Sequence, residues 1–326
     1  MQFKWLFPVM LLALACNNSD TKTNDVETST DTPAVEKPQV QADFNADSAY
    51  EYVKTQVDFG PRYPGSKGWA ACYQYLVKFM KSKADTVYLP VASAKTYDGK
   101  TIPVQNIIAV FNPKASKRIL LCAHWDTRPF ADQDDKDANK PILGANDGAS
   151  GVGVLMEIAS QIKKQNVDIG VDIIFFDAED WGDNSGYVEN SFCLGSQHWG
   201  NNLHVPGYKA DFGILLDMVG APNALFGFEG YSMSMAQNYL AKVWNTASEL
   251  GYSKYFKSFQ RGAVTDDHFY VMKATKIPMI DIIDTDPSTE SRFGKYWHTH
   301  DDNMDAIDKN TLKAVGHTVL HVVRNY

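Results

Sequence analysis

The chain has 326 residues, of which 44% are hydrophobic and 21% are charged, as in ordinary globular proteins. Its formal net charge of -8 argues against nucleic acid as a partner. The length accommodates one large α/β domain or two small ones.

The N-terminus has the pattern of a targeting segment. Residues 1–15 hold one lysine and then an apolar run that is too short for a membrane-spanning helix and typical of a secretory signal. A small residue, Ala15, precedes Cys16, which is then either a lipidated first residue, as in a bacterial lipobox, or part of a simply secreted chain. Residues 16–42 have almost no large apolar side chains and are predicted to be a disordered tether. We expect secretion across the inner membrane of a bacterium, with a lipid anchor in the periplasm or on the cell surface.

Amphipathic stretches and short apolar runs alternate along the rest of the chain. In chain order they predict helices at 47–57 and 66–83, strands at 86–92, 104–112 and 118–124, a helix at 148–164, strands at 171–177, 212–217 and 224–228, a helix at 233–250, a strand at 277–283 and a helix at 309–323. An Asp-Gly turn at 97–100 predicts a hairpin-like return between the first two strands. This order predicts a three-layer αβα sandwich, whose mixed, mostly parallel central sheet has helices on both faces.

Polar residues stand at or just after the ends of several predicted strands, and these are His124, Glu179, Asp180, Asp217 and Asp281. Ligands of open α/β sheets bind at the carboxyl ends of the strands, so we expect these side chains to meet at one rim. The acids of the loop 125–146, Asp132 among them, are instead interpreted as a solvated surface.

Several of these residues have two interpretations. His124 is either a metal ligand, oriented by Asp126, or a buried histidine satisfied by that carboxylate. Asp147 begins the predicted helix at 148–164 and is either its N-cap or a ligand. The adjacent acids Glu179 and Asp180 repel each other, and a metal ion resolves the conflict if one binds it and the other carries protons.

Two carboxylates and one imidazole suit a hydrolase-type Zn²⁺ with an open fourth position. Asp147, Asp180 and His298 supply that set. Glu179 is then left to move protons beside the metal. Cys72, Cys122 and Cys193 show no metal-binding spacing and are expected to be buried free thiols.

The motifs resemble those of the zinc-dependent exopeptidases of the M28 type across residues 45–326. The residues that carry the resemblance are His124, Asp126, Asp147, Glu179, Asp180, Asp217 and His298. Within that family, Trp297-His298-Thr299 followed by Asp301-Asp302-Asn303 is similar to the glutaminyl cyclases. The run Asp266-Asp267-His268, the stretch 216–223 and Phe293 are similar to the same group.

The resemblance implies a role for each of these positions. One Zn²⁺ would be held by the three residues Asp147, Asp180 and His298, and Glu179 would shuttle the proton. Asp217 and Asp266 would belong to a hydrogen-bonded acidic network. Trp297 and Phe293 would pack on the substrate side chain. Asp281, which replaces a histidine of the animal cyclases, is expected at the substrate site, and either Trp181 or Trp199 would supply a further pocket wall.

The expected activity is that of a glutaminyl-peptide cyclotransferase, which converts N-terminal glutamine to pyroglutamate and releases ammonia. Residues 43–326 would form its single catalytic domain, a monomer that touches the membrane only through Cys16. One alternative is a di-zinc aminopeptidase, in which His124 and Asp217 hold a second Zn²⁺ and Asp147 bridges the two ions. A second alternative is a non-catalytic binding lipoprotein on the same fold.

Overall fold

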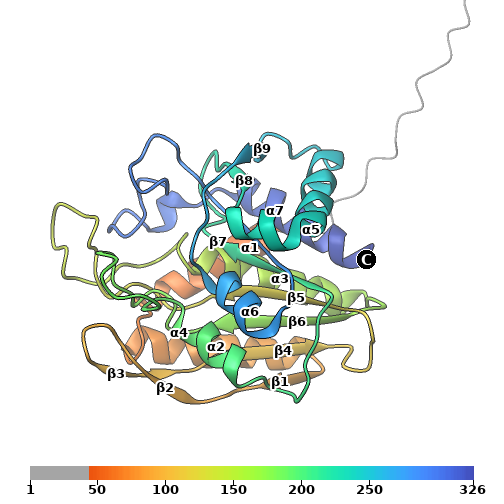
Figure 1. Cartoon of the computed structure of the whole chain (residues 1–326), viewed down its shortest axis with the longest axis horizontal. Helices are drawn as coiled ribbons and strands as arrows, with labels where there is room; N and C mark the ends of the chain where they lie inside the picture. Colours follow the sequence, from red (N-terminus) through yellow and green to blue (C-terminus); the bar gives the residue numbers. More distant parts are fainter. Residues whose placement is uncertain (1–43) are drawn as a thin grey trace, which may run out of the picture. The chain divides into compact units, whose positions relative to one another are not determined.

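A six-stranded sheet is the centre of the computed structural model, which describes residues 44–326 (Figure 1). Its strands, in spatial order, are β1 (Thr86–Tyr88), β4 (Ile107–Phe111), β6 (Gly170–Phe176), β5 (Arg118–His124), β7 (Phe212–Asp217) and β10 (Met279–Ile283). The four strands from β6 to β10 run parallel, whereas β4 and β1 pair antiparallel at one edge. The predicted mixed, mostly parallel sheet is confirmed. The predicted signal peptide at 1–15, the anchor Cys16 and the tether at 16–42 lie outside the described residues.

Helices cover both faces of this sheet, as the alternation predicted. One face packs against α2 (Lys67–Lys83), α3 (Ala149–Lys164) and α5 (Gly230–Glu249), and α1 (Ala46–Asp58) and α7 (Lys309–Arg324) pack against α3. The other face packs against the short helices α4 (Leu194–Asn201) and α6 (Asp267–Thr275). Along β5, Leu121 faces the first set and Cys122 the second, because side chains alternate along a strand. None of the described helices is long and apolar enough to cross a membrane.

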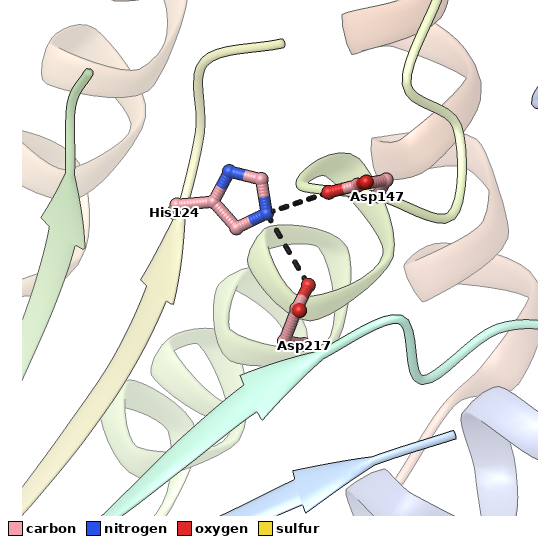
Figure 2. A group of neighbouring side chains, drawn as sticks. All are labelled: His124, Asp147 and Asp217. Atoms are coloured by element: carbon pink, nitrogen blue, oxygen red, sulfur yellow. Dashed lines mark hydrogen bonds and ion pairs between the residues drawn. The ribbon is translucent and has the colours of Figure 1, made fainter. Parts of the chain in front are cut away.

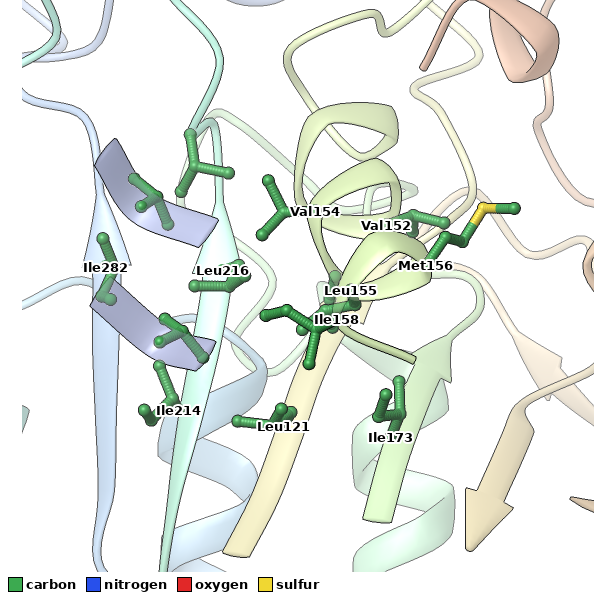
Figure 3. Packing of buried hydrophobic residues seen from close by; sticks show 14 of the residues in the cluster. Leu121, Val152, Val154, Leu155, Met156, Ile158, Ile173, Ile214, Leu216 and Ile282 are labelled. Carbon is green, nitrogen blue, oxygen red and sulfur yellow. The ribbon is translucent and has the colours of Figure 1, made fainter. Parts of the chain in front are cut away.

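Helix α3 is the central helix of the larger core. Every residue from Ala149 to Ile162 is buried, and Figure 3 shows Ile158 packed over Leu121 and Ile173 of the sheet. Each fully buried aliphatic side chain of this kind contributes about 1.5–3 kcal/mol. Gly151 lets the helix approach β7 closely, since a Cβ atom there would lie 2.2 Å from the carbonyl oxygen of Leu216. This contact fixes the start of α3 at the carboxyl ends of β5 and β7.

The structure differs from the sequence prediction at the sheet edges. The predicted hairpin exists, with Asp98-Gly99 in its turn, but β2 (Ala92–Lys95) and β3 (Thr101–Val104) form a separate two-stranded sheet. The predicted strand at 224–228 also lies outside the central sheet. Its residues form β8 (Phe226–Phe228), which pairs with β9 (Phe256–Gln260), a strand that the sequence did not predict.

Besides β9, the sequence prediction missed three short elements: α4, α6 and the 3₁₀ turn η1 (Met304–Ala306). None has the long amphipathic repeat from which the other helices were predicted. The three cysteines Cys72, Cys122 and Cys193 are free and buried, as predicted.

Candidate active site

Four of the predicted polar positions meet at the carboxyl rim of the sheet. His124 is the last residue of β5 and Asp217 the last of β7, while Glu179 and Asp180 stand in the loop that begins after β6. The prediction that Asp281 ends a strand is wrong, because it is the middle residue of β10. Its side chain is fully buried and does not line the pocket described below.

The first group of possible metal ligands contains His124, Asp147 and Asp217 (Figure 2). The Nε2 atom of His124 lies 3.0 Å from Oδ1 of Asp147 and 3.2 Å from Oδ1 of Asp217. Burial opposes protonation of His124, but the surrounding carboxylates outweigh it and raise its pKa well above the ordinary value. The three side chains therefore make either a second metal site or a buried, positively charged imidazole between acids.

The second group contains Asp147, Asp180 and His298, the three residues predicted to hold zinc. The Nε2 atom of His298 lies 3.1 Å from Oδ1 of Asp180 and 3.7 Å from Oδ2 of Asp147. Oδ2 of Asp180 is buried without a hydrogen-bond partner among the described residues, as expected of an oxygen reserved for a cation. Two carboxylates and one imidazole fit Zn²⁺. Because the two oxygens of Asp147 face different histidines, the residues also fit a bridged pair of ions.

Buried acids outside these groups hold the ligand loops. The carboxylate of Asp126 accepts hydrogen bonds from the backbone N–H of Glu179 at 3.0 Å and of Asp180 at 3.2 Å. It lies 3.6 Å from Nδ1 of His124, too far for the orienting hydrogen bond that the sequence suggested. Asp302, which the sequence gave no separate role, accepts from the backbone N–H of Asn146 at 2.7 Å and of Asp147 at 3.0 Å. Burial and the charge of Asp147 raise the pKa of Asp302 to about 7.

Asp132 was interpreted as solvated, but the structure places it behind His298. Its Oδ1 atom lies 3.2 Å from Nδ1 of His298, and Arg128 holds both of its oxygens, at 2.8 Å and 2.6 Å. A carboxylate on the second ring nitrogen orients a ligating histidine and increases its basicity. The sequence did not reveal this role of Asp132, because the residue lies in a run of acids and its contact joins loops that are far apart in the sequence.

Strained backbone accompanies the site. Ala178, Met218 and His298 have φ angles of 54°, 49° and 57°, a region that residues other than glycine rarely adopt. Ala178 precedes Glu179, and Met218 follows Asp217. Each such residue costs on the order of 1–3 kcal/mol and persists only where the surrounding fold imposes it. The strain aims these side chains away from the strand direction and into the rim.

A pocket of about 360 Å³ opens over the second group. Carboxylates form its floor, and Trp297 and Phe293 form part of its wall, with ring centroids 4.7 Å apart. The Trp297 ring also stacks on His298 at 3.7 Å, which places an aromatic face beside the ligand group. Trp181 and Trp199 are absent from the pocket lining. Trp199 belongs to α4 and is buried in the core between this helix and the sheet, and Trp181 packs beside the β2–β3 hairpin.

Glu179 stands next to the ligand Asp180 but belongs to neither the first nor the second group of ligands. Its side chain lines the pocket. Burial raises its pKa well above the ordinary value, His124 opposes that shift, and Asp180 and Asp266 add to it. The thiol of Cys193 donates a hydrogen bond to Oε1 of Glu179 at 3.1 Å. Burial and the charge of Asp217 raise the pKa of Asp266, another pocket residue, to about 7. These shifts favour the protonated form of these acids and the sharing of a proton among them.

Known proteins are similar to this chain in sequence and in structure. The model of peptidase family M28 matches residues 106–323. A glutaminyl cyclase from Tannerella forsythia has a similar structure, with a TM-score of 0.85 and 50% identity over 87% of this chain and 99% of that one. A Zn-dependent exopeptidase from Parabacteroides distasonis gives the same four values. The glutaminyl-peptide cyclotransferase of Bos taurus is 28% identical over 287 residues, 77% of this chain and 74% of the relative. The family match spans both ligand groups, and this chain belongs to peptidase family M28.

Proposed function

We propose that this chain is a zinc-dependent glutaminyl-peptide cyclotransferase, which acts on peptides and proteins with N-terminal glutamine. The observation that carries the proposal is the pocket, where Glu179 lies beside the group Asp147, Asp180 and His298 and under an aromatic wall. The glutaminyl cyclase from Tannerella forsythia supports it at 50% identity, as does the bovine cyclotransferase.

Each step uses a residue in place in the pocket. Bound zinc would polarise the γ-carbonyl of the substrate as a Lewis acid, a contribution of several kcal/mol. Glu179 accepts a proton from the α-ammonium group, and the freed nitrogen attacks the γ-carbonyl carbon. Glu179 returns the proton to the amide nitrogen, and the bond from that nitrogen to the carbon breaks. The departing ammonia takes the second proton of the attacking nitrogen and leaves as ammonium. A positioned proton carrier contributes roughly 10²–10⁴-fold. The raised pKa of Glu179 suits this role, because the group must hold the proton between the two transfers.

The aromatic wall gives the substrate side chain its place. Trp297 and Phe293 line the pocket next to His298, so a flexible glutamine side chain packs between them and the ligand group. Holding the amine and the γ-carbonyl of one residue close together makes the reaction intramolecular, and no water molecule has to be activated.

One observation favours the aminopeptidase alternative. His124 and Asp217 meet Asp147 as a second set of ligands would, so the described residues retain what a bridged di-zinc centre needs. In that enzyme Glu179 would activate water. The cyclase requires one zinc ion per chain, and we propose that stoichiometry.

Mass spectrometry of a glutamine-initiated tripeptide after incubation with the purified protein tests the function. Loss of one ammonia with both peptide bonds intact is expected, and Glu179→Gln should reduce the rate by roughly 10²–10⁴-fold without loss of zinc. Release of free glutamine, together with two tightly held zinc ions, would establish the aminopeptidase instead. A protein that binds no metal and turns over no peptide would point to the binding lipoprotein.

We further propose that Cys16 carries a lipid anchor. The support is the apolar run that ends in a small residue, Ala15, directly before this cysteine. In cells, Cys16→Ser should move the protein from the membrane fraction to the soluble fraction, and an unchanged distribution would contradict the anchor.

A further inference from the structure

Arg261 is a buried cation in the wall of the pocket. It follows β9 directly, and the segment from Arg261 to Asp266 lines the pocket opposite the ligand loops. Only 5% of the residue is exposed. Two of its guanidinium donors, Nε and Nη1, are buried and have no hydrogen-bond partner among the described residues.

Its surroundings show what the guanidinium contacts and what it does not. The group lies over the ring of Phe293, 4.7 Å from the centroid, so it is fixed against the aromatic wall. Asp281, Glu229 and Asp217 are near enough for their charges to favour the protonated form, although burial lowers the pKa of Arg261. Among the described residues, however, no carboxylate oxygen forms an ion pair with Arg261 at 4.0 Å or less.

Burial of unpaired donors is costly. A buried polar group without a partner costs about 1–3 kcal/mol, and more if it is charged. Arg261 cannot avoid this cost by losing its proton, because a guanidinium stays protonated in proteins. Because Arg261 lines the pocket, a molecule that enters the pocket can supply the missing partner.

The chemistry of the substrate indicates which group that is. Apart from the ligand His298 and the exposed Arg292, the other ionisable side chains that line the pocket are carboxylates, which serve the metal and the α-ammonium group. The γ-amide oxygen of the substrate would face the ligand group Asp147, Asp180 and His298. Every peptide substrate then has one further hydrogen-bond acceptor next to the reacting atoms, the main-chain carbonyl oxygen of its first residue. A guanidinium is a donor that matches this oxygen.

We propose that Arg261 is a substrate-binding residue, which donates a hydrogen bond to the main-chain carbonyl oxygen of the N-terminal glutamine. The contact holds the first peptide group against the wall formed by Phe293, so that the α-nitrogen points to Glu179 and the side chain to the ligand group. This inference rests on the proposed cyclase function.

The test pairs a side-chain change with the removal of one substrate oxygen. The substrates are L-glutaminamide and (R)-γ-aminovaleramide, which has the same spatial arrangement with a methyl group in place of the main-chain carboxamide. Both lose ammonia when they cyclise. The enzymes are the wild type, Arg261→Met, Arg261→Lys and, as a matched loss of one exposed positive charge, Lys295→Met. Zinc content and thermal unfolding establish that each variant is folded and loaded.

With glutaminamide, Arg261→Met should lower kcat/KM about 10- to 100-fold, because a hydrogen bond to a charged donor is lost. Arg261→Lys should recover part of the loss, and Lys295→Met should change little. With γ-aminovaleramide, Arg261→Met should lower kcat/KM by less than about 3-fold, since the oxygen is already absent.

Two results would overturn the proposal. An equal loss with both substrates would mean that Arg261 acts only through its charge on the buried acids. No loss with glutaminamide would mean that the guanidinium does not meet the substrate. A wild-type enzyme that cyclises neither substrate would instead remove the proposed function itself, and this outcome is separate because it appears before any variant is compared.

Discussion

The two oxygens of Asp147 face different histidines, Oδ1 toward His124 and Oδ2 toward His298. This one carboxylate therefore belongs to both ligand groups. A cyclase needs the group with His298, and a di-zinc peptidase would also use the group with His124. The chemistry of the chain depends on whether His124 holds a metal ion or a proton.

Substitution of the two histidines separates these roles. We expect His298→Ala to lose both zinc and activity, because it removes one of three protein ligands from the cyclase site. His124→Ala should keep one zinc ion per chain, since that group does not include His124. Elemental analysis of the desalted proteins measures both. A fall from two ions to one in His124→Ala would contradict the single-zinc assignment.

Cys193 is a positioning residue for Glu179. Its thiol donates to Oε1 at 3.1 Å, and its backbone N–H donates to the carbonyl oxygen of Glu179 at 2.8 Å. Cys193→Ala removes only the first bond and should lower kcat about 2- to 10-fold with little change in KM. Since the thiol stabilises the charged carboxylate, the acidic limb of the pH–rate profile should shift to higher pH. Cys72→Ala, also buried but remote from the pocket, is the matched control. An unshifted profile in Cys193→Ala would exclude the positioning role.

The sequence predicted the site residues that stand at or after the ends of strands. His124, Asp180 and Asp217 were predicted because a polar residue after a buried apolar run marks the rim of a parallel sheet. Asp302 and Arg261 were not predicted as site residues, since their roles come from contacts between distant loops. Asp302 meets the backbone N–H of Asp147 across 155 positions of sequence, and no local pattern records such a contact.

Close contact between α3 and β7 sets the spacing of two ligands. Asp147 precedes α3 and Asp217 ends β7, so the distance between the helix and the strand determines how far apart these two side chains lie. Gly151 makes that approach, because any Cβ there would press on backbone rather than on a flexible side chain.

Gly151→Ala should therefore affect both stability and metal binding. Overpacking costs about 1–3 kcal/mol, and we expect a lower midpoint of thermal unfolding together with weaker zinc binding. Gly262→Ala serves as the control for unfolding only, because its added methyl group would meet nothing within 4 Å. Normal zinc affinity in a destabilised Gly151→Ala would show that the spacing of the ligands tolerates movement of the helix.

The connection from α4 to β7 carries a pH-dependent contribution to stability. His204 accepts a hydrogen bond from Nε1 of Trp199 at 3.2 Å, and burial lowers its pKa to about 4. Between about pH 6.5 and 4 the unfolded chain binds a proton at this residue while the folded chain does not. The free energy of unfolding must therefore fall as the pH falls through this window.

Because His204 is only partly buried, the loss should be about 1–2 kcal/mol rather than the full value of the shift. Urea unfolding at pH 7 and pH 4.5 measures it. The decrease should be smaller by that amount in His204→Gln, which cannot be protonated. Equal decreases in both proteins would refute the assignment.

At the scale of elements, the sequence predicted the buried strands and long helices well and the peripheral elements poorly. Apolar runs of five to seven residues identified β5, β6, β7 and β10, because strands covered on both faces cannot alternate. The run at β8 is equally apolar but pairs outside the central sheet, and composition does not say which partner a strand chooses. Asp281 shows a related limit, since a buried acid in mid-strand resembles a strand end.

The whole molecule places all its ligands on one rim of a rigid sheet, with large cores on both faces. Zinc binds the folded chain and not the unfolded one, so it stabilises the protein by about 2.7 kcal/mol at a free concentration 100 times its Kd. Removal of zinc by a chelator should lower the midpoint of thermal unfolding by on the order of 5 °C.

This stabilisation should diminish in acid. Burial lowers the pKa of His298, but the charge of Asp180 and the hydrogen bonds of Asp132 and Asp180 raise it overall, so the metal-free site keeps a proton that zinc must displace. Affinity for zinc therefore falls as the pH falls. Calorimetric scans with and without zinc between pH 8 and pH 5.5 measure the difference, and a constant difference would contradict protonation of the ligand.

The ligand loops are fastened to one another by contacts that involve no metal. Arg128 donates to the carbonyl oxygen of Asp180 at 3.0 Å and holds Asp132, and Asn184 reaches Asp132 at 2.7 Å and His298 at 2.9 Å. These contacts bear on the order in which the chain folds and binds its metal ion. A chain whose ligand cage is already assembled by its own side chains completes its tertiary structure first and captures the ion afterwards, in whatever compartment supplies it.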